Sequence, residues 1–393
     1  MPPVHCGHAP FVPYGTHVSK GEEMAADVSG PMPKSAWLYP IVALGYFGLA
    51  TGLGFDEGFT GSTSGILLAI VLIPVIFGAI FAAVYHAEVI GHATGEPFGT
   101  LVLTAAVTII EVALIASVML SDDGGSPELA RDTVFSVVMT VCTGLTGICI
   151  LGGGLRFKEQ VYETTGAGAY LTVLIVLVTL TLVLPNYTQG TPGPFYSSSQ
   201  LAFFSVLTLI LYGVFLYIQM VRHRDYFVSS NGSVVAVEHA IPTARALLSA
   251  GLLFAALTAI VLLSKKFAIV VEAGREAVGS PPAVTGLIVA ILILLPESIP
   301  AFQAARRDQL QKSLNLALGS SLATIGMTFP AVAVVSLALN KPLVLGLTPR
   351  DTVLMATTLL VSSLTLGSGR TNILYGFTHL VIFAAFLFLT FQP

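Results

Sequence analysis

Long runs of almost exclusively apolar residues, separated by short polar stretches, make up most of the chain. A helix needs about 20 residues to cross the hydrocarbon core of a membrane, so a run of about 18 or more predicts a spanning helix. The runs lack the alternation of apolar and polar residues seen in membrane β-strands, and they predict an all-α polytopic membrane protein. Eleven spans are predicted: 36–53, 65–86, 98–120, 132–152, 168–185, 200–221, 245–264, 283–304, 314–339, 350–366 and 372–391.

The composition fits a chain that is embedded in lipid. Of the 393 residues, 54% are hydrophobic and 10% are charged, whereas soluble domains carry about 25% charged residues. The net charge of −4 gives no indication of a nucleic-acid partner. Three cysteines do not form a disulfide framework. We interpret two of them, Cys142 and Cys149, as helix-packing residues because they lie in one apolar run.

Lys and Arg residues are distributed unequally between the two sides of the predicted bundle. Cytoplasmic loops of membrane proteins carry an excess of these residues. Eleven of the 17 lie on the side of the N-terminus. The six on the other side are Arg131, Lys265, Lys266, Arg275, Lys341 and Arg350. We therefore expect a cytoplasmic N-terminus, an outside C-terminus because the number of spans is odd, and a bacterial inner membrane. A solvated cytoplasmic loop is predicted around His86, Glu88, His92 and Glu96.

Two carboxylates stand inside the apolar runs. Glu111 is the only ionisable residue within 98–120, and Glu297 lies in the run AILILLPESIPAF. A charged side chain at mid-bilayer costs about 2.5–3.5 kcal/mol, so such residues are functional by default. Pro296 and Pro300 flank Glu297, and each proline frees a helix carbonyl. Free carbonyls inside a membrane are tolerated where they line a cavity.

The surroundings of the two carboxylates match. Each is followed, on the next span, by a pair of hydroxyl-bearing residues at i and i+4: Ser136 and Thr140, then Ser320 and Thr324. Residues at this spacing share one helix face. The match predicts an internal repeat of five spans. Because five is odd, the second repeat enters the membrane inverted, and inverted repeats with a site at the midplane are a recurrent transporter plan.

The domain organisation follows from this repeat. We expect a disordered cytoplasmic tail over 1–34, which lacks the basic segment and apolar core of a signal peptide. An extra first helix would occupy 35–64. The first five-helix repeat would span 65–221, a cytoplasmic connecting loop 222–244, and the second five-helix repeat 245–393.

The residue types at this predicted site are hard oxygen ligands. Ca²⁺ takes about 6–8 oxygen ligands in flexible geometry, and the carboxylates of Glu111 and Glu297 would bind it as a transported ion. The supporting hydroxyls would be those of Thr108, Ser136, Thr140, Ser320, Ser321 and Thr324. The spans hold no Cys/His cluster, which argues against a zinc or copper site, and no cofactor is expected.

The same two carboxylates would hold protons. Burial in a low-dielectric medium and a nearby like charge both favour a protonated carboxyl group. One divalent cation or two protons would neutralise the same pair, and the two states exclude each other. A carrier that crosses only with a neutral pair must exchange one for the other, provided that Glu111 and Glu297 lie close together.

Two stretches carry a family resemblance. GEPFGTLVLTAAVTIIEVALI (95–115) and LLPESIPAFQAARRDQLQKSLNLALGSSLATIGMTFPAVAVVS (294–336) resemble the two repeats of the ChaA-type calcium/proton antiporters of the calcium/cation antiporter superfamily. The resemblance covers the spans from about 65 to 391. It implies two inverted five-helix units with one ion-binding acidic residue in each, here Glu111 and Glu297. Related vacuolar exchangers carry Asn three residues before that acidic residue, whereas this chain has Thr108 and Leu294.

The leading hypothesis is therefore an antiporter that exchanges Ca²⁺ for H⁺ by alternating access. An Na⁺(K⁺)/H⁺ antiporter with the same mechanism is the alternative, because Leu294 offers no side-chain oxygen. A cation channel would need pore-lining rings from a symmetric oligomer, which an internal repeat disfavours. An enzyme is not expected, since no HExxH motif is present. Membrane lipid is the other expected partner, and the sequence leaves the oligomeric state open.

Overall fold

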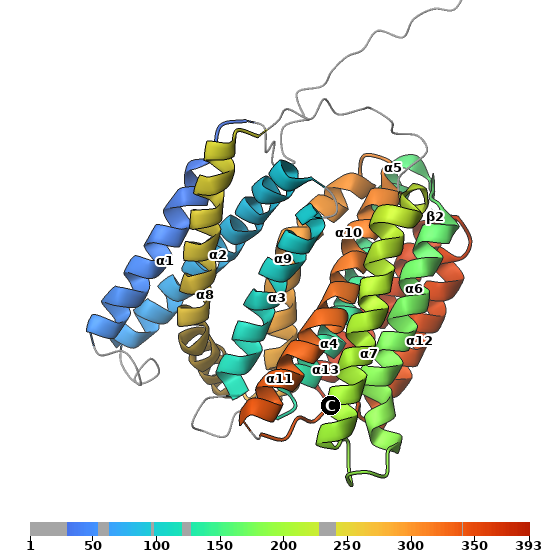
Figure 1. Cartoon of the computed structure of the whole chain (residues 1–393). Helices are drawn as coiled ribbons and strands as arrows, with labels where there is room; N and C mark the ends of the chain where they lie inside the picture. Colours follow the sequence, from blue (N-terminus) through green and yellow to red (C-terminus); the bar gives the residue numbers. More distant parts are fainter. Residues whose placement is uncertain (1–29, 54–62, 96–97, 120–126, 228–240, 340) are drawn as a thin grey trace, which may run out of the picture.

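The computed structural model describes residues 30–53, 63–95, 98–119, 127–227, 241–339 and 341–393. These residues form a helical bundle (Figure 1). Most of the predicted tail and of the predicted connecting loop lie outside the described residues.

The bounds of the elements are as follows. The α-helices are α1 (Lys34–Gly52), α2 (Thr63–Thr94), α3 (Phe98–Met119), α4 (Leu129–Met139), α5 (Thr146–Phe157), α6 (Thr164–Val178), α7 (Ser198–Tyr217), α8 (Thr243–Ala277), α9 (Ala283–Ala305), α10 (Leu310–Ala323), α11 (Phe329–Leu339), α12 (Pro349–Leu366) and α13 (Ile373–Phe391). The π-helical segments are η1 (Thr140–Leu145), η2 (Thr179–Val183), η4 (Ile218–Arg222) and η6 (Thr324–Thr328), and short 3₁₀ turns are η3 (Leu184–Tyr187) and η5 (Arg224–Tyr226). The strands are β1 (Glu159–Val161) and β2 (Arg370–Asn372).

Eight helical stretches of the described residues are long and apolar enough to cross a membrane. Some join two elements, such as Leu129–Phe157, which contains α4, η1 and α5. The prediction of a mostly helical membrane protein is therefore confirmed. The other three predicted spans coincide with α1, with α3 and with α12; within α3, Leu101–Ser117 forms a shorter apolar helix.

The prediction of a loop is wrong at two places, where the structure has helix. His86, Glu88 and His92 belong to α2, which continues to Thr94, and the His86 side chain is fully buried with Nε2 3.0 Å from the Ala36 carbonyl oxygen. Helical hydrogen bonding thus continues through polar residues that a hydropathy pattern assigns to solvent.

The same happens in α8, which continues to Ala277 through the predicted outside loop. Lys266 is only 4% exposed there, and its Nζ lies 5.9 Å from the centre of the Phe47 ring on α1. A lysine buries its long apolar stem readily, so its charge does not mark a helix end.

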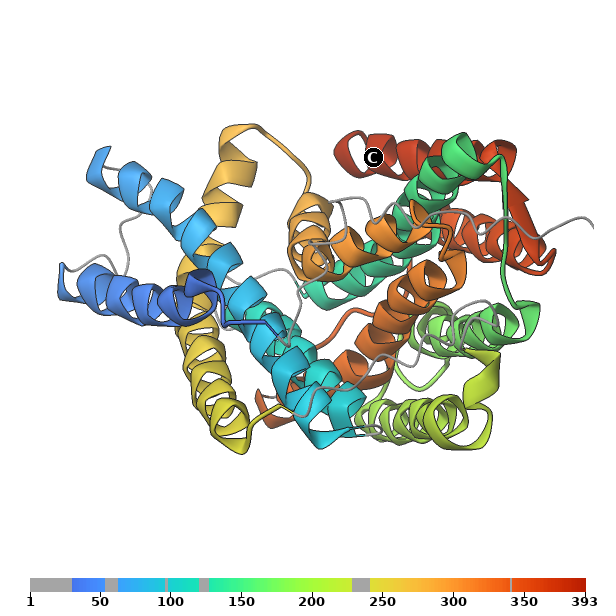
Figure 2. The ribbon, with the colours of Figure 1, turned by 90° about the horizontal axis from the view of Figure 1, so that it is seen from above.

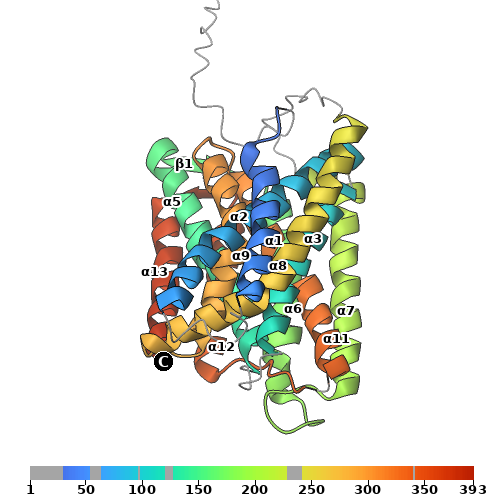
Figure 3. The ribbon, with the colours of Figure 1, turned by 90° about the vertical axis from the view of Figure 1, so that its left-hand side faces the viewer.

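The helices pack in two groups that meet at α9. One group contains α1, α2 and α8 with α3, and the other contains α4 to α7, α10, α12 and α13 (Figures 1 and 2). Val289, Leu292 and Ile293 of α9 pack in the first group, while its Leu287 and Ala290 pack in the second. Figure 3 shows α1 and α8 lying on the outside of the first group. Helices α3 and α9 therefore stand at the boundary between two apolar cores.

A group of polar contacts, here called the upper clasp, lies at the upper face of the bundle in the view of Figure 1. Strand β1 pairs antiparallel with β2, and this pairing joins the α5–α6 connection to the α12–α13 connection. Gln160, the middle residue of β1, is 1% exposed. Its Nε2 donates to the Ala305 carbonyl oxygen at 2.9 Å and to Asp308 Oδ1 at 3.0 Å. This upper clasp thus also holds the turn between α9 and α10.

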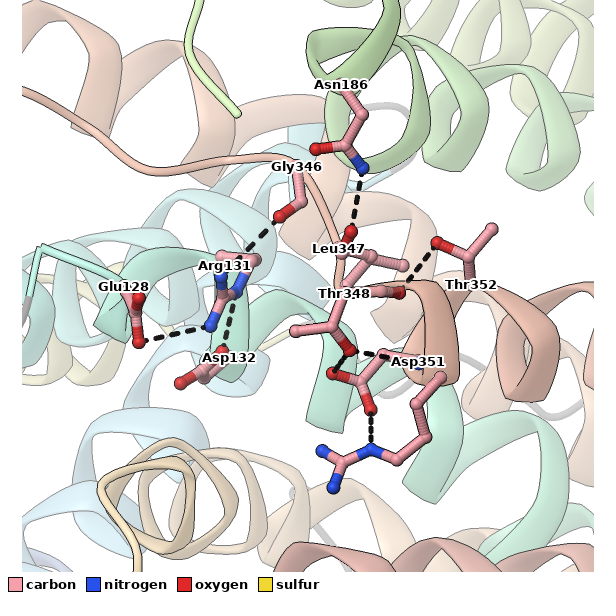
Figure 4. A network of polar contacts seen from close by, with 10 residues as sticks. Glu128, Arg131, Asp132, Asn186, Gly346, Leu347, Thr348, Asp351 and Thr352 are labelled. Carbon is pink, nitrogen blue, oxygen red and sulfur yellow. Dashed lines mark hydrogen bonds and ion pairs between the residues drawn. The ribbon is translucent and has the colours of Figure 1, made fainter. Parts of the chain in front are cut away.

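A second clasp lies at the lower face (Figure 4). In the buried connection between α11 and α12, the Gly346 carbonyl oxygen accepts a hydrogen bond from Arg131 Nη1 at 3.5 Å. Its backbone N–H groups at Leu345 and Gly346 both donate to the Pro194 carbonyl oxygen, in the α6–α7 connection. Arg131 also pairs with Asp132 at 2.8 Å and with Glu128 at 3.3 Å. This lower clasp therefore fixes the start of α4.

We expect Gln160→Leu to destabilise the folded protein by about 1–3 kcal/mol, because the carbonyl group of the buried Ala305 loses its donor. The measurement is the thermal unfolding midpoint in detergent. Glu159→Gln, which changes the exposed neighbouring side chain, is the control and should leave the midpoint in place. Equal midpoints for Gln160→Leu and the parent protein would show that the upper clasp does not stabilise the fold.

Candidate ion-binding site

Glu111 lies in α3 with its side chain fully buried. Its Oε2 accepts a hydrogen bond from the Thr328 hydroxyl, at the end of η6, over 2.5 Å. Its Oε1 makes no hydrogen bond within the described part of the chain. Since an unpaired buried polar oxygen is costly, half of this carboxylate is available to a ligand.

Glu297 lies in α9, which continues as one helix through Pro296 and Pro300. The residue as a whole is half-buried, but its Oε2 is enclosed and makes no hydrogen bond to a described residue. Ser320 of α10 lies within reach of this carboxylate. The charge of Glu297 acts on Glu111, so the two predicted carboxylates are electrostatic neighbours at the boundary of the two helix groups.

Several hydroxyls on helical segments that pack against α3 or α9 also have no hydrogen-bond partner among the described residues. They come from the middle of the two long helices that change from α to π winding, and such π segments are frequent at functional sites. These hydroxyls belong to Thr140, Ser320 and Thr324. Thr324 also lies within reach of Glu111. Together with the free carboxylate oxygens, they offer a set of hard oxygen ligands.

The remaining predicted supporting residues are placed less favourably. Ser321 is fully buried and its hydroxyl is unpaired in the described structure, but it follows Ser320 directly and so points about 100° away around the helix. The Thr108 hydroxyl donates to Met327 Sδ at 3.9 Å. Ser136 is buried at 2% exposure, on the same helix as Thr140.

Two residues near the site were not predicted as part of it. Thr328 contacts Glu111 directly, yet a threonine in an apolar run reads as an ordinary helix residue. Glu88 of α2 acts electrostatically on Glu297 and is itself near Lys312. The spacing of Thr328, four residues after Thr324, continues the i, i+4 series and was the signal in the sequence.

The chemistry of this set is that of an oxygen cage. Within the described ranges, no group of three His, Cys, Asp or Glu residues could hold a metal ion, and the two buried cysteines, Cys142 and Cys149, are free thiols. Carboxylate and hydroxyl oxygens suit alkaline-earth and alkali cations or protons, rather than softer metals.

Comparison with known proteins decides the family. The model of the family described as sodium/calcium exchanger protein matches residues 64–221 and 248–392. The chain belongs to the sodium/calcium exchanger protein family. The resemblance to calcium/cation antiporters is thereby confirmed.

Two curated relatives of this exchanger are similar over most of their length. A protein of Sinorhizobium fredii, named putative ionic transporter y4hA, is 46% identical over 78% of this chain and 84% of its own. The sodium-potassium/proton antiporter ChaA of Escherichia coli is 35% identical over 78% of this chain and 83% of its own. Both relatives are named as transporters and not as enzymes.

Solved structures show the same fold at low sequence identity. The structure of native YfkE has a TM-score of 0.68 at 16% identity, covering 91% of this chain and all of its own. The crystal structure of the H⁺/Ca²⁺ exchanger CAX has a TM-score of 0.65 at 14% identity, covering 90% of this chain and 89% of its own. The exchanger therefore shares its helical architecture with both.

Proposed function

We propose that the protein exchanges a cation for protons across a membrane by alternating access, with Glu111 and Glu297 binding either. The observation that carries the proposal is the pair of neighbouring carboxylates, each with one enclosed oxygen that has no partner among the described residues. A buried carboxylate left in this state is stabilised by a proton or by a cation. Occupancy by one therefore excludes the other.

Ca²⁺ is the first candidate cation. Two carboxylates balance its two charges, and the unpaired hydroxyls of Thr140, Ser320 and Thr324 would add oxygens toward the 6–8 that Ca²⁺ takes. Ser136, Ser321 and Thr108 stay predictions as further ligands.

Na⁺ or K⁺ is the second candidate. The Escherichia coli relative at 35% identity is named a sodium-potassium/proton antiporter. Leu294, three residues before Glu297, is buried at 2% exposure and offers no side-chain oxygen, whereas Thr108 holds the matching place before Glu111. The missing oxygen weakens the case for the 6–8 ligands that Ca²⁺ takes.

We further propose that 65–221 and 245–393 are two inverted five-helix units. The π segments η1 and η6 begin at Thr140 and Thr324, the second residue of each predicted hydroxyl pair. The two clasps support the same division. The upper clasp joins one connection of the first unit to two connections of the second unit. At the opposite face, the lower clasp joins one connection of the second unit to two connections of the first unit. The 222–244 connection and the extra helix at 35–64 remain outside both units in this scheme.

The proposed setting is a bacterial inner membrane with a cytoplasmic N-terminus and an outside C-terminus. Helix α1 begins at the upper face of Figure 1, while the chain ends at the lower face. The excess of Lys and Arg on the side of the N-terminus supports this orientation.

A flux assay tests the function and names the cation. The purified protein is placed in liposomes loaded at acidic pH with an internal pH dye, and Ca²⁺, Na⁺ or K⁺ is added outside. We expect one cation to drive alkalinisation of the lumen, because each entering cation displaces protons from the shared site. Protein-free liposomes are the control. If no cation moves protons, exchange at this site is refuted.

A further inference from the structure

The hydrogen bond between Thr328 and Glu111 differs from the within-helix bonds of many other threonines in the bundle. A helix threonine ordinarily returns its hydroxyl to the carbonyl four residues earlier in its own helix. This arrangement is seen at Thr172, Thr179, Thr258 and Thr390. Thr328 instead donates across the bundle, from η6 to a carboxylate of α3. Its position is therefore determined by the site rather than by its own helix.

The consequence for Glu111 is that its two oxygens are unequal. Oε2 is held by the Thr328 hydroxyl at 2.5 Å, while Oε1 is enclosed and has no partner among the described residues. A cation or a proton therefore has one oxygen open to it, and the hydrogen bond to the other oxygen can persist when the ligand is bound.

The first repeat has no hydroxyl at the position that matches Thr328. Thr328 is four residues after the first threonine of η6, and the same place in η1 is Gly144. Glycine has no donor there, and an added Cβ would lie 3.0 Å from the Phe383 ring. Helix α9, which carries Glu297, packs against η1. The two halves of the site are thus chemically different at this position.

We propose that Thr328 is a positioning residue that holds Oε2 of Glu111 and so leaves Oε1 as the oxygen that binds the transported cation. The inference rests on the proposed exchange function. Without the hydroxyl, the carboxylate is free to rotate and must be ordered when the cation binds, which lowers the affinity. Thr328 therefore acts on the cation through Glu111.

The test compares Thr328→Val, which removes the hydroxyl at nearly constant shape, with Thr328→Ser, which keeps it. Exchange is measured in liposomes at a fixed pH near neutrality with Ca²⁺ as the varied cation, or Na⁺ if the parent protein exchanges only that ion. For Thr328→Val we expect the apparent KM to rise about tenfold, the scale of one hydrogen bond to a charged group. The rate at saturating cation should be kept, because the change affects the binding of the cation. Thr328→Ser should behave like the parent protein.

Controls separate this role from a structural one. Thr390→Val removes a buried threonine hydroxyl that bonds its own helix and should leave the KM unchanged. If Thr328→Val does not fold, Thr328→Ala carries the same comparison. A KM that is unchanged in Thr328→Val, or raised as far in Thr328→Ser as in Thr328→Val, overturns the inference. Absence of exchange by the parent protein instead overturns the proposed function itself.

Discussion

Glu111→Gln and Glu297→Gln should each reduce coupled cation/proton exchange by about a hundredfold or more. Glutamine keeps the shape of the side chain but binds no proton at this range of pH and carries no charge for the cation. The loss of one interaction with a charged group, at about 3 kcal/mol, corresponds to a factor of this size. Glu111 Oε1 and Glu297 Oε2 are both enclosed, so water does not readily replace the missing charge.

The measurement is the initial rate of luminal alkalinisation in liposomes with equal amounts of inserted protein. Glu159→Gln is the matched control, since Glu159 is an exposed carboxylate on β1 and is not part of the candidate site. Parental rates in both site variants would make the carboxylates structural. Loss in only one variant would show that the two carboxylates do not act as a pair.

Gly286→Val is expected to have the second largest effect. Gly286 of α9 packs so closely on α4 that an added Cβ would lie 2.8 Å from the backbone carbonyl carbon of Asp132 and 2.9 Å from the Thr133 nitrogen. Backbone atoms cannot turn aside as a side chain can, so the helices must separate. Overpacking of this kind costs about 1–3 kcal/mol or more, and here it also moves Glu297 away from α4.

Thermal unfolding in detergent and the liposome assay together check this expectation. The unfolding midpoint should fall, and exchange should be lost even in the fraction that stays folded at low temperature. Gly251→Val on α8, where an added Cβ meets nothing within 4 Å, should change neither. A folded, fully active Gly286→Val protein would mean that the α4–α9 spacing is not critical.

Hydropathy alone predicted most of the helical architecture, because lipid requires long apolar helices whatever their function. It failed where polar residues continue a helix. Lys266 was assigned to a loop, but its side chain is buried within α8. His86 was assigned to a loop, but it packs in α2 against α1. A pattern of polarity cannot distinguish a solvated loop from a helix turn that is covered by another helix.

At the site, the carboxylates were predictable and their partners were not. Glu111 and Glu297 are conspicuous because a lone acid in an apolar run is expensive. Thr328 is not, since a threonine hydroxyl can satisfy itself within its own helix. The π segments that carry Thr140 and Thr324 leave no compositional mark, so the direction of those hydroxyls had to come from the fold.

The two clasps have a consequence for how the protein is made. Strand β1 leaves the ribosome early, but its partner β2 is synthesised only after the seven α-helices α6 to α12 have followed. Gln160 likewise has no partner until Ala305 and Asp308, which also belong to the second half, have been synthesised. The first half must therefore wait in the membrane with polar groups unpaired. Its exposure to quality-control proteases should end only when the second half has been inserted.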